Sequence, residues 1–342
     1  MTAAASCPAF QISVICPVFN ARAAELRLAV ASVLDQDHAH VCEVLLIDDG
    51  STNKDTLQAI QDLAASDSRV VALRTARNGG PALARNLGLD RATRDWIGFL
   101  DSDDLWAPDR LTRAETAWRS HPDAGWIAGD VLLLNTAGTL EPAAALACTR
   151  DANGPVALCA TPTLTRAIIL DGLHLGVSLI RRDRLGALRF DPAVRYGEDI
   201  LLLVLLSLDV AMLRAPGAAY ISRRQHESMM WSAGRLSPAF ASGPRAGFRD
   251  PRLKRFRREY RWALYAVYKD LAVNNLINRR AFAGLRHAFS ALALDPREIR
   301  PFLRYLQLIA TQSQPRLAQR ARAYSYCEQV VLDEGGAFLK IR

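Results

Sequence analysis

The amino-acid sequence predicts an α/β protein with a Rossmann-like, mostly parallel sheet and flanking helices, followed by a helical C-terminal region. In the first 125 residues, short apolar runs alternate with segments of helical periodicity. Near-continuous apolar runs separated by helices are typical of parallel strands that are covered on both faces. Beyond residue 236 the strand-like runs stop and the chain becomes basic, with helical periodicity.

The first four predicted strands follow one another at regular intervals. They cover residues 11–19, 43–49, 69–75 and 95–101, which are rich in β-branched and other apolar side chains. Apolar residues at helical spacing predict helices over 22–34 and 55–65. A third helix is expected to begin at Pro81, because proline suits the first turn, with Asn78 as its cap.

The pattern is less regular between residues 125 and 235. Strands are predicted over 125–135 and 176–183, a buried apolar helix after residue 198, and a bent strand or hairpin over 211–224. Residues 136–161 are expected to form an exposed excursion. We therefore predict a first domain over residues 1–235, subdivided at residue 120, and a second domain over 236–342.

The composition excludes several classes of protein. Half of the residues are hydrophobic, which is enough to build a core and argues against disorder. The net charge of +8 favours an anionic partner such as nucleotide phosphate, nucleic acid or anionic lipid. The six cysteines are scattered without metal-site spacing, and no signal peptide or long apolar span is evident. We expect reduced thiols and a cytoplasmic location.

Three of the first four predicted strands finish in segments with polar or unusual residues. They are Pro17–Asn20, Asp48–Gly50 and Asp101–Asp104. In open α/β sheets, ligands bind outside the carboxyl ends of the strands, where these segments converge. The sequence therefore predicts a site at that edge of the sheet.

The acidic segment has two interpretations. Asp101, Asp103 and Asp104 carry like charges that a divalent cation with oxygen ligands would relieve, and a phosphate would complete its coordination. Alternatively, these residues cap a helix that starts near Pro108. Arg77 and Arg85 are candidates for binding a diphosphate, and their alternative is a solvated helix face.

Five motifs in register resemble family-two glycosyltransferases, which have the GT-A fold. They are PVFN, LLIDDGST, ARNGGPALARNLGL, WIGFLDSDDLWAPDRL and YGEDI. The resemblance covers about residues 10–225. Within that family the chain is most similar to bacterial exopolysaccharide enzymes of the succinoglycan-assembly kind.

The resemblance implies a nucleotide-binding part over residues 10–120 and an acceptor side over 121–235. Asp49 would accept a hydrogen bond from the uracil ring N–H, which favours a uridine nucleotide. Asp104 would hold hydroxyls of the donor sugar. The implied nucleotide-sugar residues are Pro17, Phe19, Asn20, Asp49, Arg77, Arg85, Asn86, Asp101, Ser102 and Asp104.

The resemblance also implies a metal site and a catalytic pair. Asp101 and Asp103 form the D-x-D motif for Mn²⁺ or Mg²⁺, with Asp103 as the more direct ligand. His226 is a further candidate for the metal or the diphosphate, and its alternative is a structural role. Asp199 would be the general base and Glu198 its supporting carboxylate. Without the other motifs, this pair would be interpreted as a helix cap.

The predicted function is an inverting, metal-dependent glycosyltransferase that uses a UDP-sugar, with UDP-glucose as the favoured donor. The acceptor is expected to be a saccharide or a lipid-linked oligosaccharide in exopolysaccharide synthesis. Two alternatives stay open: an inactive glycosyltransferase-like binding module, and the same chemistry with UDP-galactose, a UDP-N-acetylhexosamine or a dTDP-sugar. A dinucleotide-dependent oxidoreductase is disfavoured, because PVFNAR replaces the G-x-G-x-x-G expected after the first strand.

Residues 255–269, RFRREYRWALYAVYK, interleave basic and aromatic side chains. A nucleic-acid patch is disfavoured because no recognised binding module accompanies the charge. A helix on the inner membrane surface, a homodimer interface and a packed helix with a solvated basic face all remain open.

Overall fold

The computed structural model describes residues 10–36, 41–135, 138–142, 157–223, 237–277, 280–296, 330–332 and 338–340. The chain divides into two units. The first comprises residues 1–168, 173–193 and 198–225, and the second comprises 169–172, 194–197 and 226–342. The domain boundary that we predict at residue 235 falls among residues 224–236, which lie outside the described part, so it stays a prediction.

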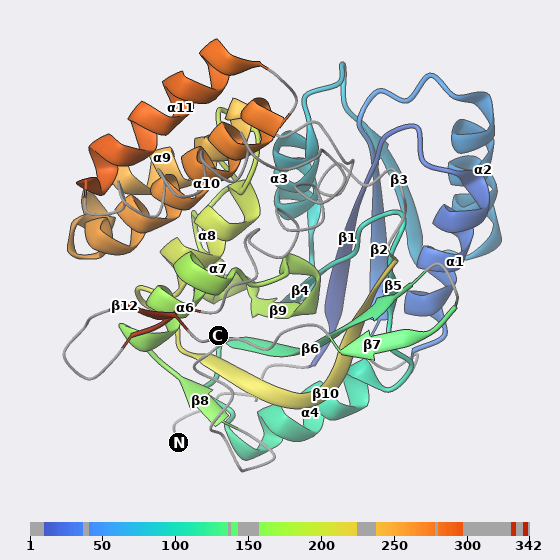
Figure 1. Cartoon of the computed structure of the whole chain (residues 1–342). Coiled ribbons are helices and arrows are strands. Elements are labelled where there is room, and N and C mark those ends of the chain that lie inside the picture. Colours follow the sequence, from blue (N-terminus) through green and yellow to red (C-terminus); the bar gives the residue numbers. More distant parts are fainter. Residues whose placement is uncertain are drawn as a thin grey trace. The chain divides into compact units, whose positions relative to one another are not determined.

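The first unit is built on a sheet with the strand order β3-β2-β1-β4-β9-β6-β10-β5 (Figure 1). The first four strands of the sequence are parallel to one another, as predicted. They are β1 (Ile12–Val18), β2 (Val41–Asp48), β3 (Val70–Arg74) and β4 (Trp96–Phe99). The connecting helices are α1 (Ala23–Leu34), α2 (Lys54–Ser66) and α3 (Pro81–Arg91).

The rest of the sheet mixes strand directions. Strand β9 (Ser178–Arg181) lies antiparallel between β4 and β6 (Trp126–Leu134). Strand β10 (Met212–Arg223) is one long strand parallel to β6, with two register shifts between Arg214 and Tyr220. Strand β5 (Leu105–Trp106) pairs antiparallel with β10. Short strands β7 (Leu140–Pro142) and β8 (Ala157–Cys159) pair with β6 and β10.

Further helical elements alternate with these strands along the chain. They are α4 (Arg110–Ser120), α6 (Thr163–Asp171), the 3₁₀ turn η1 (Leu175–Val177), α7 (Arg182–Leu185) and α8 (Glu198–Leu206). Residues Leu201–Leu206 of α8 are all buried, which confirms the buried apolar helix. Among the described helices, none combines the length and the apolar character that a membrane crossing needs.

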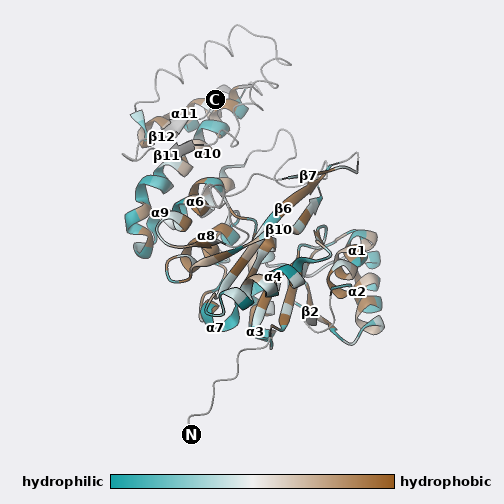
Figure 2. Ribbon diagram, turned by 90° about the horizontal axis from the view of Figure 1, so that it is seen from below, coloured by the Kyte–Doolittle hydropathy of each residue, from teal (hydrophilic) through white to brown (hydrophobic). Residues whose placement is uncertain are grey.

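The core follows from the apolar strands. Trp96, Trp106 and Trp126 are almost completely buried, and the side chains of β1 are buried except at Pro17. Figure 2 shows apolar colouring along much of β6 and β10. Cys16 and Cys159 are buried, and neither forms a disulfide.

One local expectation is wrong, and one of the two interpretations of the acidic segment does not hold. The cap of α3 is Gly80, with φ +84°, and not Asn78, because the N–H groups of Gly79 and Gly80 bind the carboxylate of Asp49. The acidic segment does not cap a helix, since β5 follows it and α4 begins only after Asp109.

The second unit is helical where it is described between residues 237 and 296. It contains η2 (Pro238–Ala241), α9 (Ser242–Arg249), η3 (Pro251–Phe256), α10 (Arg257–Ile277) and α11 (Ala281–Leu294). The helix expected from Pro301 lies outside the described residues. The helical expectation is wrong near the end, where β11 (Val330–Leu332) and β12 (Phe338–Lys340) form an antiparallel pair.

Helix α10 contains most of the basic, aromatic segment that the sequence singles out. Tyr260, Leu264, Val267 and Leu271 are buried along one face of this helix. Arg257 and Arg261 are exposed. Of the interpretations left open, the packed helix with a solvated basic face therefore describes α10.

Gly88 provides a test of the close contact between α3 and β1. A Cβ atom at this position would lie 2.5 Å from Cγ2 of Ile15, which is fully buried. We expect Gly88→Ala to lower the free energy of unfolding in urea by about 1–2 kcal/mol, because overpacking outweighs the helix propensity of alanine. Arg91→Ala, on an exposed position of the same helix, is the matched control and should stay within about 0.5 kcal/mol of the parent. Equal stability of the two variants would contradict the tight contact.

Candidate active site

The three polar segments predicted to converge lie at one edge of the sheet. Strands β1, β2 and β4 are parallel, with Val18 beside Asp48 and Ile15 beside Phe99, so their carboxyl ends share this edge. The antiparallel strand β9 begins at the same edge, since Leu179 pairs with Gly98 near the end of β4. The residues just before β9 therefore reach the site as well.

Arg85 joins two of the predicted motifs. Its guanidinium is buried, with Nη2 2.9 Å from Oδ1 of Asp101 and Nη1 2.9 Å from Oε1 of Glu198. The same guanidinium lies 5.6 Å from the ring centroid of Phe190. One side chain from α3 thus connects the acidic segment after β4 with the first turn of α8.

Burial and neighbouring charges shift the pKa values of Arg85 and its two carboxylate partners in different directions. Burial by itself would lower the pKa of Arg85, but Asp101, Glu198 and Asp199 raise it, so the guanidinium stays charged. Burial raises the pKa of Asp101, whereas Arg85 and His174 lower it, and the net direction is downward. For Glu198, burial and the neighbouring Asp199 raise the pKa above its ordinary value in spite of Arg85.

Asp104 is the most strongly perturbed carboxyl group of the site. It is 5% exposed, and its Oδ1 accepts a hydrogen bond of 2.8 Å from the backbone N–H of Arg223. Burial, followed by the charges of Asp101 and Asp103, raises its pKa to about 8. Burial and Asp101 also raise the pKa of Asp103. Burial and like charges both disfavour the ionised form of these carboxyl groups, and a bound cation would relieve both effects.

His174, which the sequence did not single out, lies beside this segment. Its Nδ1 accepts a hydrogen bond from the N–H of Gly176, and its Nε2 lies 3.9 Å from Oδ2 of Asp104. One potential ligand atom from each of Asp101, Asp104 and His174 lies within 4.8 Å of the others. Oxygen and imidazole donors suit Mn²⁺, so these residues fit a divalent cation. Asp103 is not part of this group, and its ligand role stays a prediction.

Strand β10 holds the acidic segment in place. The hydroxyl of Tyr220 accepts a hydrogen bond of 2.9 Å from the N–H of Asp101, and its buried ring lies 4.6 Å from the ring of His174. Arg223 donates from Nε to the carbonyl of Asp103 and from Nη2 to the carbonyl of Glu25. Gly176 leaves room for Tyr220, since a Cβ there would lie 2.3 Å from the tyrosine ring.

Two of the predicted nucleotide residues organise loops. The buried carboxylate of Asp49 accepts hydrogen bonds from Gly79, Gly80 and the hydroxyl of Thr75. Asn20 adopts a left-handed conformation with φ 47°, and its Oδ1 accepts from the N–H groups of Thr52 and Asn53. Both residues connect the loops that follow β1, β2 and β3, and their contact with a nucleotide stays a prediction.

The other predicted nucleotide residues differ in exposure. Phe19 exposes 51% of its surface at the end of β1, and Arg77 is also exposed. Pro17 and Ser102 are half-buried.

The last of the predicted site residues to be located in the structure are Asn86, Asp199 and His226. Asn86 exchanges two hydrogen bonds, of 2.8 and 2.9 Å, with the backbone of Phe190, so it supports the ring beside Arg85. Asp199 is half-buried. His226 lies outside the described residues.

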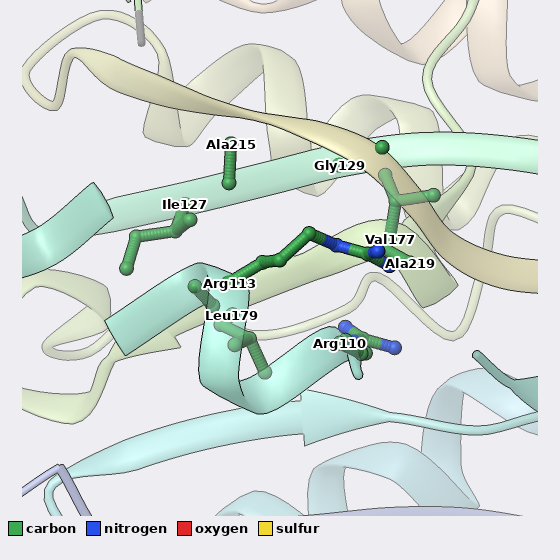
Figure 3. A pocket seen from close by; sticks show the side chains of 10 residues that line it. Arg110, Arg113, Ile127, Gly129, Val177, Leu179, Ala215 and Ala219 are labelled. Carbon is green, nitrogen blue, oxygen red and sulfur yellow. The ribbon is translucent and has the colours of Figure 1, made fainter. Parts of the chain in front are cut away.

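A cavity next to α4 is separate from these residues. It is lined by Arg110, Arg113 and mainly small or apolar residues of β6, β9 and β10 (Figure 3). Arg110 is buried, lies 3.9 Å from the ring centroid of Trp106 and donates to the carbonyl of Ser178. Burial lowers its pKa to about 9. None of the predicted site residues lines this cavity, so the converging carboxylates mark the better candidate.

Comparisons with known proteins show which family the chain resembles. The family described as "Glycosyl transferase family 2" matches residues 13–129. An uncharacterized glycosyltransferase of Haemophilus influenzae is 45% identical over 102 residues, or 30% of this chain and 40% of that protein. The succinoglycan biosynthesis protein ExoW of Rhizobium meliloti is 31% identical over 219 residues, covering 61% of this chain and 68% of ExoW.

A solved structure extends the likeness along the chain. Residues 1–349 of Staphylococcus aureus TarS, crystallised with UDP-GlcNAc, align over 96% of this chain and 99% of that one, with a TM-score of 0.61 and 18% identity. At this identity the alignment concerns the fold alone. The alignment with the Haemophilus relative spans less than half of that protein's length.

The raised pKa of Asp104 predicts a pH-dependent stability in metal-free protein. Between its ordinary value of 3.8 and about 8, the folded state holds a proton on Asp104 that the unfolded state has lost. The free energy of unfolding should therefore fall as the pH rises through this range, by up to about 1.4 kcal/mol per pH unit.

Urea unfolding in EDTA at several pH values measures this slope. Asp104→Asn should flatten the slope, because it removes the titrating group. Ser102→Ala, in the same segment, should leave the slope unchanged because it removes no proton-binding group. An unaltered slope in Asp104→Asn would exclude Asp104 as its source.

Proposed function

The chain belongs to glycosyl transferase family 2, and on that premise we propose that it transfers a sugar from a UDP-sugar to a saccharide acceptor with inversion at the anomeric carbon. The GT-A fold expected from the sequence is confirmed by the mixed sheet and by the alignment with TarS. The observation that carries the proposal is the bridge from Arg85 to Asp101 and Glu198. It connects the acidic segment, on the donor side, with the Glu-Asp pair on the acceptor side.

In this proposal Asp199 is the general base. It lies next to Glu198 in the first turn of α8 and is half-buried, so a hydroxyl group can approach it. Asp199 takes the proton of the acceptor hydroxyl while that oxygen forms a bond to the anomeric carbon and the bond to the diphosphate breaks. The ion pair with Arg85 holds the side chain of Glu198 in place, and Glu198 thereby positions the neighbouring Asp199. A single displacement of this kind converts an α-linked donor into a β-glycoside.

The carboxylates of Asp101, Asp103 and Asp104 are proposed to hold Mn²⁺ or Mg²⁺, with His174 as an additional ligand. A bound divalent cation stabilises negative charge on a departing diphosphate. The convergence of Asp101, Asp104 and His174 supports this assignment, as do the raised pKa values of Asp103 and Asp104. Tyr220 and Arg223 keep the segment in position through its backbone and through Asp104.

The donor is proposed to be a UDP-hexose. The sequence favours glucose, whereas TarS was crystallised with UDP-GlcNAc, and an Azorhizobium caulinodans relative named N-acetylglucosaminyltransferase is 32% identical over 125 residues. The name of ExoW supports a role in polysaccharide synthesis, with a free or lipid-linked saccharide as acceptor. A screen of UDP-glucose, UDP-galactose, UDP-GlcNAc and dTDP-glucose with Mn²⁺, scored by nucleotide release, tests the donor. Failure to release nucleotide from any of them, with or without acceptor lipid extract, would favour the inactive binding module.

Asp199→Asn tests the base. We expect transfer to fall by about 10³-fold or more, because a base contributes to the transition state, while the Kd for UDP changes little. Transfer is measured by product formation and UDP binding by calorimetry. Asp191→Asn, an exposed carboxylate before α8, is the matched control and should retain activity. Retained transfer in Asp199→Asn would remove this residue from its role.

Asp103→Ala tests the cation. We expect weaker UDP binding than in the parent protein when Mn²⁺ is present, by about tenfold, and equal binding in EDTA. Calorimetry under both conditions separates the two effects. An equal loss with and without the metal would instead show a structural role for Asp103.

A further inference from the structure

Helix α11 directs its bulky apolar side chains outward. Phe282, Leu285 and Phe289 expose 86%, 45% and 72% of their surfaces. Their spacing of three and four residues places them on one side of the helix. We call these three residues the outer α11 face.

The opposite side of α11 is built mainly from small residues, together with the buried His287 and the partly buried Leu292. Gly284, Ala288 and Ala291 are buried there. A Cβ atom at Gly284 would lie 2.5 Å from Cγ of Leu276, and Ala288 packs against Ala272 of α10. Figure 1 shows α10 and α11 side by side within this unit.

This arrangement reverses the usual pattern of a surface helix. A helix that contributes only to a core buries its large apolar residues and exposes its polar ones. In α11 the small residues and the partly buried Leu292 make the contact with α10, and both phenylalanines are exposed. A cluster of exposed large apolar side chains is typical of an interaction surface.

The charge around α11 indicates the kind of partner. Residues 237–296 contain twelve Lys and Arg against four Asp and Glu, a net charge of +8 that equals the charge of the whole chain. Helix α11 itself has no acidic residue, and the exposed Arg286 lies one turn from both Phe282 and Phe289. The exposed Arg280 directly precedes the helix.

We propose that the outer α11 face docks on the surface of a bilayer that contains anionic phospholipid. Phenylalanine and leucine would enter the boundary between headgroups and acyl chains, and Arg286 would pair with lipid phosphate. A second copy of the chain would bring two segments of the same positive charge together, whereas an anionic bilayer complements both the charge and the apolar face. This inference is independent of the reaction proposed above.

The membrane-binding face proposed here lies on a different helix from the one whose sequence is typical of a membrane-surface helix. Residues 255–269 have the basic and aromatic composition of a membrane-surface helix, but Phe256 and Tyr260 are buried. The exposed phenylalanines belong to α11, whose sequence contains a single arginine and no lysine. Because the aromatic side chains of α11 are exposed and Phe256 and Tyr260 are buried, we assign the proposed membrane contact to α11 and not to α10.

Vesicle co-sedimentation with the full chain tests this proposal. We compare vesicles of pure phosphatidylcholine with vesicles that also contain phosphatidylglycerol. The parent protein should bind the anionic vesicles at least about tenfold better, and high salt should weaken this binding. The triple variant F282S/L285S/F289S should lose about tenfold or more in affinity, and Arg286→Gln should lose less.

A matched control and a gain-of-signal variant accompany this measurement. Leu28→Ser replaces another exposed leucine, 56% exposed on α1, and should bind like the parent. Phe282→Trp should show a blue-shifted fluorescence emission on anionic vesicles, whether or not the triple variant folds. Thermal unfolding of each variant establishes that it is folded.

Three outcomes would overturn the proposal. One is unchanged vesicle binding by the folded triple variant, and a second is equal binding to neutral and anionic vesicles. The third is a parent protein that ignores vesicles but forms dimers that the triple variant dissociates in light scattering, which would make a second copy the occupant of this face.

Discussion

The buried guanidinium of Arg85, shared between Asp101 and Glu198, is the interaction on which the candidate site depends. A buried cation is costly unless it is paired, and the buried carboxylate of Glu198 is likewise costly without the cation. Each partner therefore stabilises the others in their positions. Because Asp101 follows β4 and Glu198 begins α8, this set of charges also holds two distant parts of the first unit together.

The change of strand direction in the sheet explains what surrounds that interaction. The parallel strands β1, β2 and β4 deliver their carboxyl ends to one edge. The antiparallel β9 begins at the same edge and is preceded there by His174. Strand β10 adds Tyr220 and Arg223, which hold the acidic segment by its backbone. The site thus uses both directions of the mixed sheet.

The net charge of the chain is unevenly distributed, which bears on the two proposed binding sites. Residues 237–296 carry a net charge equal to that of the whole chain, so the remaining residues are balanced overall. In the acidic segment, burial and neighbouring carboxylates raise the pKa values of Asp103 and Asp104. The proposed cation binds beside these carboxyl groups, and the proposed membrane contact belongs to the unit with excess positive charge.

The sequence alone determined the order of the first four strands and the three helices between them, and the segments that end three of these strands. These features are encoded locally, by apolar periodicity and by turn residues. Only the tertiary structure decided that Arg85 bridges Asp101 and Glu198, that His174 lies near Asp101 and Asp104, and that α11 rather than α10 exposes its aromatic side chains. Pairing between residues far apart in sequence depends on strand order and direction, and the exposure of a side chain depends on which neighbours cover it. Neither the long-range pairing nor the exposure can be predicted from the periodicity of a single segment.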